Sequence, residues 1–404
     1  MALSLDIILL LIFGVILLAV ILINRKRVEL QKILFPVLYL ILYKTRWGID
    51  LMDRLANRYR NFIKILGYSS IGIGFVGMIY ATYLITSIMI KFLIAPRTTD
   101  PGLSIVMPGT YVPGVGQLSF FYWIIGIFII AVIHEFTHGV VARAHNVELK
   151  SSGFAVFSVI MPLFPAAFVE PNEKKLAKES DVVQFSILAA GPVSNIVMAI
   201  IILLIFPYVI NPNISAPFED TFTTPVGFSF HVLNNTPASN AGIESGAVFV
   251  EVNEKQINSS QLFLTTIYGI QPSQTVKLKD IKGKTYTVVA TKHPQVEGKG
   301  YFGLDITSVR NEKVLKADKQ TSGKIFFWFK DLFKWLFLLS FVIGVFNLLP
   351  LGPVDGGRML QIALLKTTNN KKIAHKVWSY VAILLLLLLA IGLVATYLKK
   401  FGLF

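Results

Sequence analysis

The chain has 404 residues, of which 54% are hydrophobic and 15% charged, and its mean hydropathy is +0.64. This composition is too apolar for an ordinary soluble enzyme and indicates an integral membrane protein. Because the chain contains no cysteine, disulfides, thiolate metal sites and a cysteine nucleophile are excluded. No nucleic-acid motif accompanies the net charge of +15, so we attribute the charge to basic loops beside membrane spans and expect no nucleic-acid partner.

Hydropathy along the chain predicts a polytopic α-helical membrane protein with about six transmembrane helices. One further apolar segment, 33–43, is too short to cross a bilayer and is expected to be interfacial or re-entrant. A stretch rich in proline and glycine, 95–119, interrupts regular structure. The six predicted spans cover residues 5–23, 65–94, 120–142, 183–210, 325–349 and 377–398.

Two segments between the spans have a different character. Segment 153–171 is apolar but contains three prolines, which indicates a hairpin or loop that can dip into the bilayer. Segment 211–322 is rich in polar residues, turn dipeptides and short β-rich runs, so we expect a soluble, mostly-β insert. The predicted domains are an N-terminal transmembrane and interfacial region over 1–119, a membrane half over 120–210, the insert over 211–322 and a second membrane half over 323–404.

The distribution of basic residues predicts the orientation in the membrane. The loop 95–119 holds only Arg97, whereas 24–64 is strongly basic and is therefore expected to be cytoplasmic. Alternation of the spans then places the insert 211–322 outside, because long domains cross largely regardless of their charge. The basic residues of 24–64 are Arg25, Lys26, Arg27, Lys32, Lys44, Arg46, Arg54, Arg58, Arg60 and Lys64.

The sequence HEFTH, residues 134–138, lies inside a predicted span. Positions i and i+4 of a helix share one face, so His134 and His138 can direct two imidazoles at one metal ion. Glu135 lies beside them, where a carboxylate can take a proton from water, and HExxH on a helix is the zincin pattern. The alternative is a pair of interfacial histidines satisfied by hydrogen bonds. Ionisable residues in a span favour the functional interpretation.

A catalytic zinc ion usually has three protein ligands, so a third ligand is expected elsewhere in the chain. Asp355 is the best candidate, because it is a lone carboxylate in NLLPLGPVDGGR at the end of an apolar span. The alternative role for Asp355 is a helix N-cap. The remaining histidines are poorer candidates because of their positions after a span, in the insert or before the last span: His145, His231, His293 and His375.

These motifs resemble the site-2 protease family of intramembrane zinc metalloproteases, peptidase family M50. The family combines HExxH with an aspartate from an LDG motif, and this chain has VDG, with Val354 in place of leucine. AAGPVSN, residues 189–195, resembles the family's GPxxN element, and FPAAFVEP resembles the segment before it. The resemblance covers about 120–395 and implies two catalytic membrane halves around the insert.

The resemblance also implies roles for individual residues and for the insert. His134, His138 and Asp355 are expected to bind Zn²⁺, and Glu135 to act as the general base. Asn195 is expected to donate a hydrogen bond to the substrate backbone or oxyanion, or instead to make a polar contact between helices. Asn347 is a second candidate of the same kind. Residues 224–257 resemble a PDZ domain, which accepts a peptide as an added strand, here along VGFSF, or only gates access to the protease.

The predicted function is therefore hydrolysis of peptide bonds within the transmembrane segments of membrane proteins. Segment 153–171 is expected either to offer a strand edge to an unwound substrate or to be a passive loop. Two other functions stay open: a catalytically silent membrane-anchored PDZ adaptor, and a metal-binding membrane transporter. Fe²⁺ or Co²⁺ could occupy a site of these ligands in place of Zn²⁺.

Overall fold

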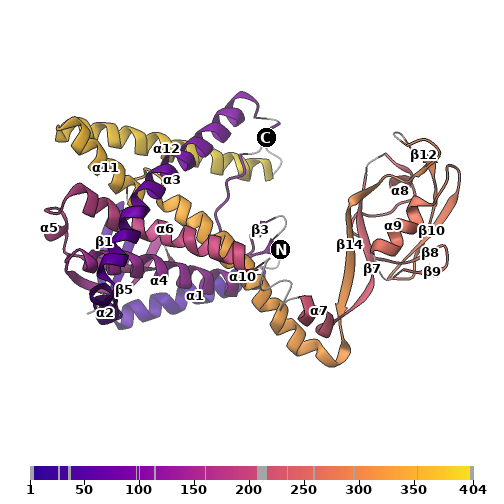
Figure 1. The fold of residues 1–404 in the computed structure, drawn as a ribbon, viewed down its shortest axis with the longest axis horizontal. Coiled ribbons are helices and arrows are strands. Elements are labelled where there is room, and N and C mark those ends of the chain that lie inside the picture. Colours follow the sequence, from indigo (N-terminus) through magenta and orange to yellow (C-terminus); the bar gives the residue numbers. More distant parts are fainter. Residues whose placement is uncertain are drawn as a thin grey trace. The chain divides into compact units, whose positions relative to one another are not determined.

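The computed structural model describes all residues except 1–3, 26–27, 35–37, 97, 100, 113–114, 160, 207–215, 234, 258–259, 294–295, 353 and 401–404. The chain forms two compact units. The first unit comprises Met1–Pro207 and Asp331–Phe404, and the second comprises Tyr208–Lys330. Figure 1 shows the first unit as mainly helical and the second as mainly strands. The insert expected over 211–322 falls inside the second unit.

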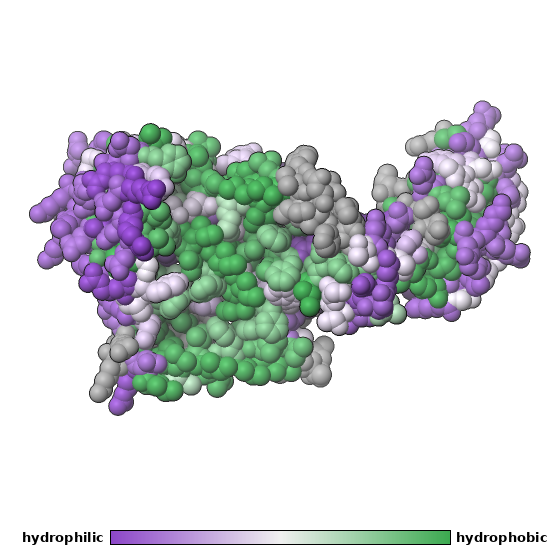
Figure 2. All heavy atoms as spheres, turned by 60° about the horizontal axis from the view of Figure 1, so that its bottom comes forward, coloured by the Kyte–Doolittle hydropathy of each residue, from purple (hydrophilic) through white to green (hydrophobic). Residues whose placement is uncertain are grey.

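Among the described residues, five helices are long and apolar enough to cross a membrane. The shortest of them, α1, has 19 residues, so at 1.5 Å per residue it approaches the roughly 30 Å of a bilayer core. In Figure 2 hydrophobic residues cover much of the visible face of the helical unit, and hydrophilic residues gather at one end. The five helices are α1 (Leu5–Ile23), α3 (Arg60–Ile94), α4 (Phe120–Ala144), α6 (Asp181–Ile205) and α12 (Lys371–Lys400).

The sixth predicted span is not among these five. Residues 325–349 overlap helix α10 (Gln320–Asn347), which carries Lys330, Asp331 and Lys334 in its middle. The apolar run that follows these charges ends with the helix and is about 20 Å long at the rise of an α-helix, which is too short to span. The expected count of six spans is therefore not confirmed. The shorter helices of this unit are α2 (Ile49–Arg58), α5 (Glu173–Leu176) and α11 (Asp355–Thr368).

A four-stranded antiparallel sheet lies within the first unit, with the strand order β1-β2-β5-β6. The predicted hairpin over 153–171 is confirmed, since β5 (Leu149–Val159) pairs with β6 (Met161–Pro171). The short apolar segment 33–43 belongs to the same sheet through β1 (Val28–Leu34) and β2 (Leu38–Thr45). Within the described residues β6 pairs only with β5, and an edge strand tolerates its prolines. A small separate hairpin is made by β3 (Tyr111–Val112) and β4 (Gly116–Gln117).

Helix α4 is fixed at both of its ends. At the start, the backbone N–H of Phe120 donates to Asp6 Oδ1 of α1 at 2.9 Å. Near the other end, the guanidinium of Arg143 pairs with Asp53 of α2. The buried face of α2 contains Ile49, Met52 and Ala56, which join a hydrophobic cluster with residues of α4. These contacts hold the helix that carries HEFTH in a defined position.

The second unit contains a six-stranded sheet in which β9 pairs with β8 and the others follow the order β11-β10-β8-β7-β14. Its core includes Phe228, Phe230, Phe249 and Phe263, all at most 2% exposed. The predicted peptide-accepting strip VGFSF lies in β7, between β8 and β14, so that prediction is wrong. The elements are α7 (Ala216–Phe222), β7 (Thr223–Val232), α8 (Pro237–Asn240), β8 (Phe249–Val252), β9 (Lys255–Gln256), α9 (Ser260–Tyr268), β10 (Thr275–Asp280), β11 (Thr285–Val289), β12 (Thr291–Lys292), β13 (Gly300–Tyr301) and β14 (Leu304–Leu315).

Candidate metal centre

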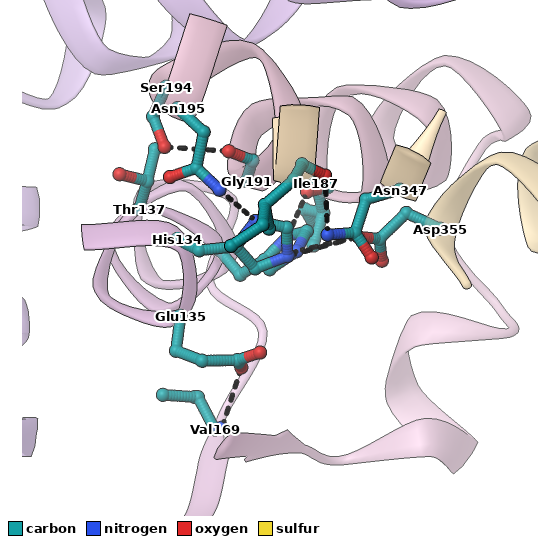
Figure 3. Close-up of polar contacts among 12 residues, drawn as sticks. His134, Glu135, Thr137, Val169, Ile187, Gly191, Ser194, Asn195, Asn347 and Asp355 are labelled. Carbon is teal, nitrogen blue, oxygen red and sulfur yellow. Dashed lines mark hydrogen bonds and ion pairs between the residues drawn. The ribbon is translucent and has the colours of Figure 1, made fainter. Parts of the chain in front are cut away.

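Three potential metal ligands converge inside the first unit (Figure 3). The Nε2 atoms of His134 and His138 lie 3.1 Å apart, as expected for imidazoles one helical turn apart on α4. Asp355 Oδ2 lies 3.1 Å from His134 Nε2 and 3.3 Å from His138 Nε2. Donor atoms about 2.0–2.1 Å from one tetrahedral zinc ion are separated by about 3.3 Å, so these three atoms have the spacing of one metal site.

Asp355 reaches the histidines from the first residue of α11. The N-cap of this helix is Val354, and no side chain caps it, so the carboxylate of Asp355 is directed at the histidines and the N-cap alternative does not hold. A methyl group on Gly356 would collide with the carbonyl of Leu348, so only glycine lets α11 begin this close to the preceding turn. Trp378 of α12 donates its indole N–H to the carbonyl of Gly357 at 2.9 Å and secures the same turn.

Helix α6 packs behind both histidines. The carbonyl of Ile187 lies 2.6 Å from His138 Nδ1, and Asn195 Nδ2 lies 3.1 Å from His134 Nδ1. Between them, Gly191 faces the ring of His138, and a methyl group there would lie 2.7 Å from two ring carbons. The GPxxN element therefore provides space for one ligand and a polar partner for the other. The sequence pattern contains this glycine, but its spatial neighbour could not be read from it.

Glu135 points in another direction from the same helix. Its Oε2 accepts a hydrogen bond of 2.9 Å from the backbone N–H of Val169 in β6. Figure 3 shows its carboxylate directed away from His134 and Asp355, toward that strand. A small cavity of about 50 Å³ is lined by Glu135 and Val169 together with Trp47. The contact between Glu135 and Val169 was not expected from the sequence, because it joins a helix to a strand and the pattern of neither segment indicates the other.

Other predicted and rejected candidates can be placed relative to the ligands. Asn347, at the end of α10, donates Nδ2 to the carbonyl of Ile343 at 2.9 Å, and Figure 3 shows it beside Asp355. His145 lies at the end of α4, with its Nε2 3.2 Å from Ser186 Oγ. Burial, and to a smaller extent Lys64, lower the pKa of His145 to about 4. His145 therefore stays uncharged at neutral pH and contacts α6 instead of the metal ligands.

The residues present fit a zinc ion. Two neutral imidazoles and one carboxylate are a common ligand set for catalytic zinc and leave a fourth position for water or substrate. Metal-binding histidines usually have a hydrogen-bonding partner on the second ring nitrogen, and both His134 and His138 have one here. Among the described residues, His134, His138 and Asp355 form a group whose ligand atoms lie close enough together to hold one metal ion. The arrangement is a candidate metal site within a membrane protein, and its ligand types are those found in metallopeptidases.

Comparison with known sequences assigns the family. Residues 122–389 match the sequence model of peptidase family M50, and the chain belongs to this family. It is 25% identical over 343 residues to the uncharacterised protein MJ0971 of Methanocaldococcus jannaschii, covering 82% of this chain and 80% of that protein. It is 24% identical over 271 residues to the zinc metalloprotease RasP of Oceanobacillus iheyensis, covering 55% of this chain and 61% of RasP. Membership of the family implies a metalloprotease that uses zinc.

A likeness to one solved structure concerns a small part of the chain. The PDZ domain of an SdrC-like protein from Listeria monocytogenes matches 20% of this chain and 88% of that domain. The sequence identity is 21% and the TM-score is 0.19. Values this low assign no function to the second unit.

Proposed function

We propose that this protein is an intramembrane zinc metalloprotease that hydrolyses peptide bonds within the transmembrane segments of other membrane proteins. The observation that carries the proposal is the cluster of His134, His138 and Asp355 in a bundle of apolar helices. At 1.5 Å per residue, His138 and His134 lie about 9 and 15 Å from the C-terminal end of α4. This position supports ligands that lie below the membrane surface, where transmembrane substrates are.

His134, His138 and Asp355 would hold the zinc ion. When bound, zinc polarises the scissile carbonyl and lowers the pKa of water to about 7. Glu135 is the general base in this proposal: its carboxylate takes a proton from the attacking water and later delivers one to the leaving amine. Because Glu135 now accepts a hydrogen bond from Val169, its side chain has to turn toward the ligands before it can act.

The edge of β6 opposite β5, with which no strand pairs among the described residues, is the proposed binding place for the substrate. A peptide bond in a helix is covered by helical hydrogen bonds, so a transmembrane substrate has to unwind before cleavage. The N–H of Val169 points away from β5 toward Glu135, and strand alternation directs the N–H of Ala167 the same way. An unwound substrate can add to this edge as a strand and so lie directly beside Glu135.

Asn347 is proposed to hold the substrate backbone. It lies beside Asp355 at the end of α10, and its amide Nδ2 carries a second hydrogen besides the one donated to Ile343. An alanine at this position is expected to reduce cleavage while zinc content stays the same. Loss of zinc in Asn347→Ala would contradict a role toward the substrate.

The second unit is proposed to lie outside the cell membrane and to gate access or bind peptide ends. Because VGFSF is an interior strand, the peptide-accepting edge is expected at β14, which ends the sheet and packs against α9. The absence of cysteine makes orientation simple to test. A single cysteine placed at Glu297 should react with an impermeant maleimide added outside intact cells, and one placed at Asn57 should not. The reverse pattern would overturn the orientation.

One experiment separates the protease from an adaptor or a transporter, since neither of these needs a base beside metal ligands. The full-length protein in detergent is given a transmembrane substrate, and wild type is compared with Glu135→Ala. Glu297→Ala, on the second unit, is the matched control. We expect Glu135→Ala to retain zinc and lose cleavage, while the control cleaves normally. Equal turnover by Glu135→Ala and wild type would remove the protease interpretation.

A further inference from the structure

The buried amide of Asn195 has one polar atom without a partner. Asn195 is 0% exposed, and a methyl group on Gly344 of α10 would lie 3.2 Å from its Cβ, so helix packing covers it closely. Its Nδ2 lies 3.1 Å from His134 Nδ1. Its Oδ1, by contrast, is the buried side-chain oxygen or nitrogen that lacks a hydrogen bond among the residues the structure describes. Buried polar atoms without partners are rare and require an explanation.

The protonation of His134 supplies that explanation. His134 presents Nε2 to Asp355 and His138, so Nε2 is the atom available to a metal ion. An imidazole that binds metal through Nε2 is neutral and carries its proton on Nδ1. With that proton present, an Asn195 N–H facing Nδ1 would place two donors against each other. A half-turn of the amide brings Oδ1 to Nδ1, where it accepts a hydrogen bond from Nδ1–H, and turns the amino group to the position that Oδ1 held.

The neighbouring ligand shows the same arrangement with an unambiguous partner. His138 Nδ1 lies 2.6 Å from the carbonyl oxygen of Ile187, and a carbonyl can only accept a hydrogen bond. The proton of His138 is therefore on Nδ1, and its Nε2 is free to bind metal. Helix α6 thus provides an acceptor to each histidine: a backbone carbonyl to His138 and, after the half-turn, an amide oxygen to His134.

We propose that Asn195 is a positioning residue that accepts a hydrogen bond from His134 Nδ1–H and so fixes the tautomer and ring orientation of this metal ligand. The proposal rests on the proposed function in that His134 binds the metal. It differs from the role expected from the sequence, in which Asn195 donates to the substrate or oxyanion. The two roles make opposite demands on the side chain: one requires an acceptor, and the other requires a donor.

Zinc affinity separates these roles. The dissociation constant is measured by chelator competition on full-length protein in detergent for wild type, Asn195→Ala and Asn195→Asp, with Asn347→Ala as the control. Loss of a residue that orients a metal ligand usually weakens binding about 10- to 100-fold, and we expect this for Asn195→Ala. An ionised carboxylate in Asn195→Asp can accept but not donate, so we expect this variant to bind zinc nearly as tightly as wild type. Asn347→Ala should not change zinc affinity.

Two results would overturn the proposal. One is wild-type zinc affinity in Asn195→Ala, and the other is an affinity of Asn195→Asp as weak as that of Asn195→Ala. Thermal unfolding with excess chelator serves as the folding control. Asn195→Asp has to unfold near the wild-type temperature before its zinc affinity is compared with that of wild type. A protein that binds zinc but cleaves nothing would end the protease proposal while leaving the zinc affinities, and hence the role of Asn195, intact.

Discussion

The substitution Gly191→Ala is expected to damage the metal centre although Gly191 binds no metal. A methyl group at this position would lie 2.7 Å from Cδ2 and Cε1 of His138 and still closer to Nε2. Carbon atoms in ordinary contact are about 3.5–4.0 Å apart, so the ring would have to retreat by about 1 Å. The ring has little room to do so, because its Nδ1 is held by the carbonyl of Ile187 at 2.6 Å.

The size of the effect follows from the tolerance of metal sites. Ligand distances vary by only about 0.2 Å, so a displacement of about 1 Å takes His138 out of the site. Apparent binding free energies of structural zinc with four ligands are about 10–16 kcal/mol, which is about 3 kcal/mol for one ligand. A loss of about 3 kcal/mol corresponds to a dissociation constant about 100-fold higher. Cleavage should fall with zinc occupancy.

Chelator competition on the detergent-solubilised protein measures this change directly. Gly72→Ala is the matched control, since Gly72 is also a helical glycine and, among the described residues, no atom outside the adjoining helix backbone lies within 4 Å of an added methyl group. The control should bind zinc normally and unfold at an equal or higher temperature, because alanine favours helices over glycine. Wild-type zinc affinity in Gly191→Ala would show that the contact between Gly191 and His138 does not restrict the ligand.

Three further changes test other parts of the structure. Asp355→Ala should lower the zinc-to-protein ratio measured by mass spectrometry, and an unchanged ratio would exclude Asp355 as a ligand. Ala167→Pro removes an N–H from the edge of β6 opposite β5, so it should slow cleavage without lowering the unfolding temperature. Ala166→Pro removes an N–H that faces β5, so this variant should lower the unfolding temperature. His145→Gln should remove a pH dependence of the unfolding temperature. The pKa of His145 in the folded protein, about 4, is below the usual 6.5 of the unfolded chain, so acid destabilises the folded protein. The stability that neutral His145 contributes is complete above pH 6.5 and is lost toward pH 4, by about 3 kcal/mol. Equal pH profiles of His145→Gln and wild type would contradict this.

Local features of the site could be predicted from the sequence because they depend on helix geometry. The spacing of His134 and His138 places both rings on one face whatever the rest of the fold does. Asp355 is more than 200 positions away, and nothing local places it at the histidines, so its assignment depended on the motif around it. The contacts of Ile187 and Asn195 on α6 with the two histidines could not be predicted for the same reason. The carbonyl of Ile187 leaves no signal in a side-chain pattern.

Features that depend on pairing between distant strands were missed or predicted wrongly. Segment 33–43 is apolar and short, which fits a re-entrant segment as well as a strand, and its neighbour β5 begins more than 100 residues later. VGFSF has the composition of a binding strand, but it pairs with β14, which lies far from it in the sequence. The charges in α10 were visible in the sequence. The apolar residues on either side of them gave the impression of one continuous span.

The position of the open side of β6 has a consequence for where water resides. Val169 lies at the depth of Glu135, and hydrocarbon cannot satisfy the amides of an unpaired strand. Under the proposed function this flank lies within the bilayer, and its amides, apart from the Val169 N–H that Glu135 accepts, would have to face water or a guest chain instead of lipid tails. The water consumed in the proposed hydrolysis would then be close to Glu135, the residue proposed to activate it.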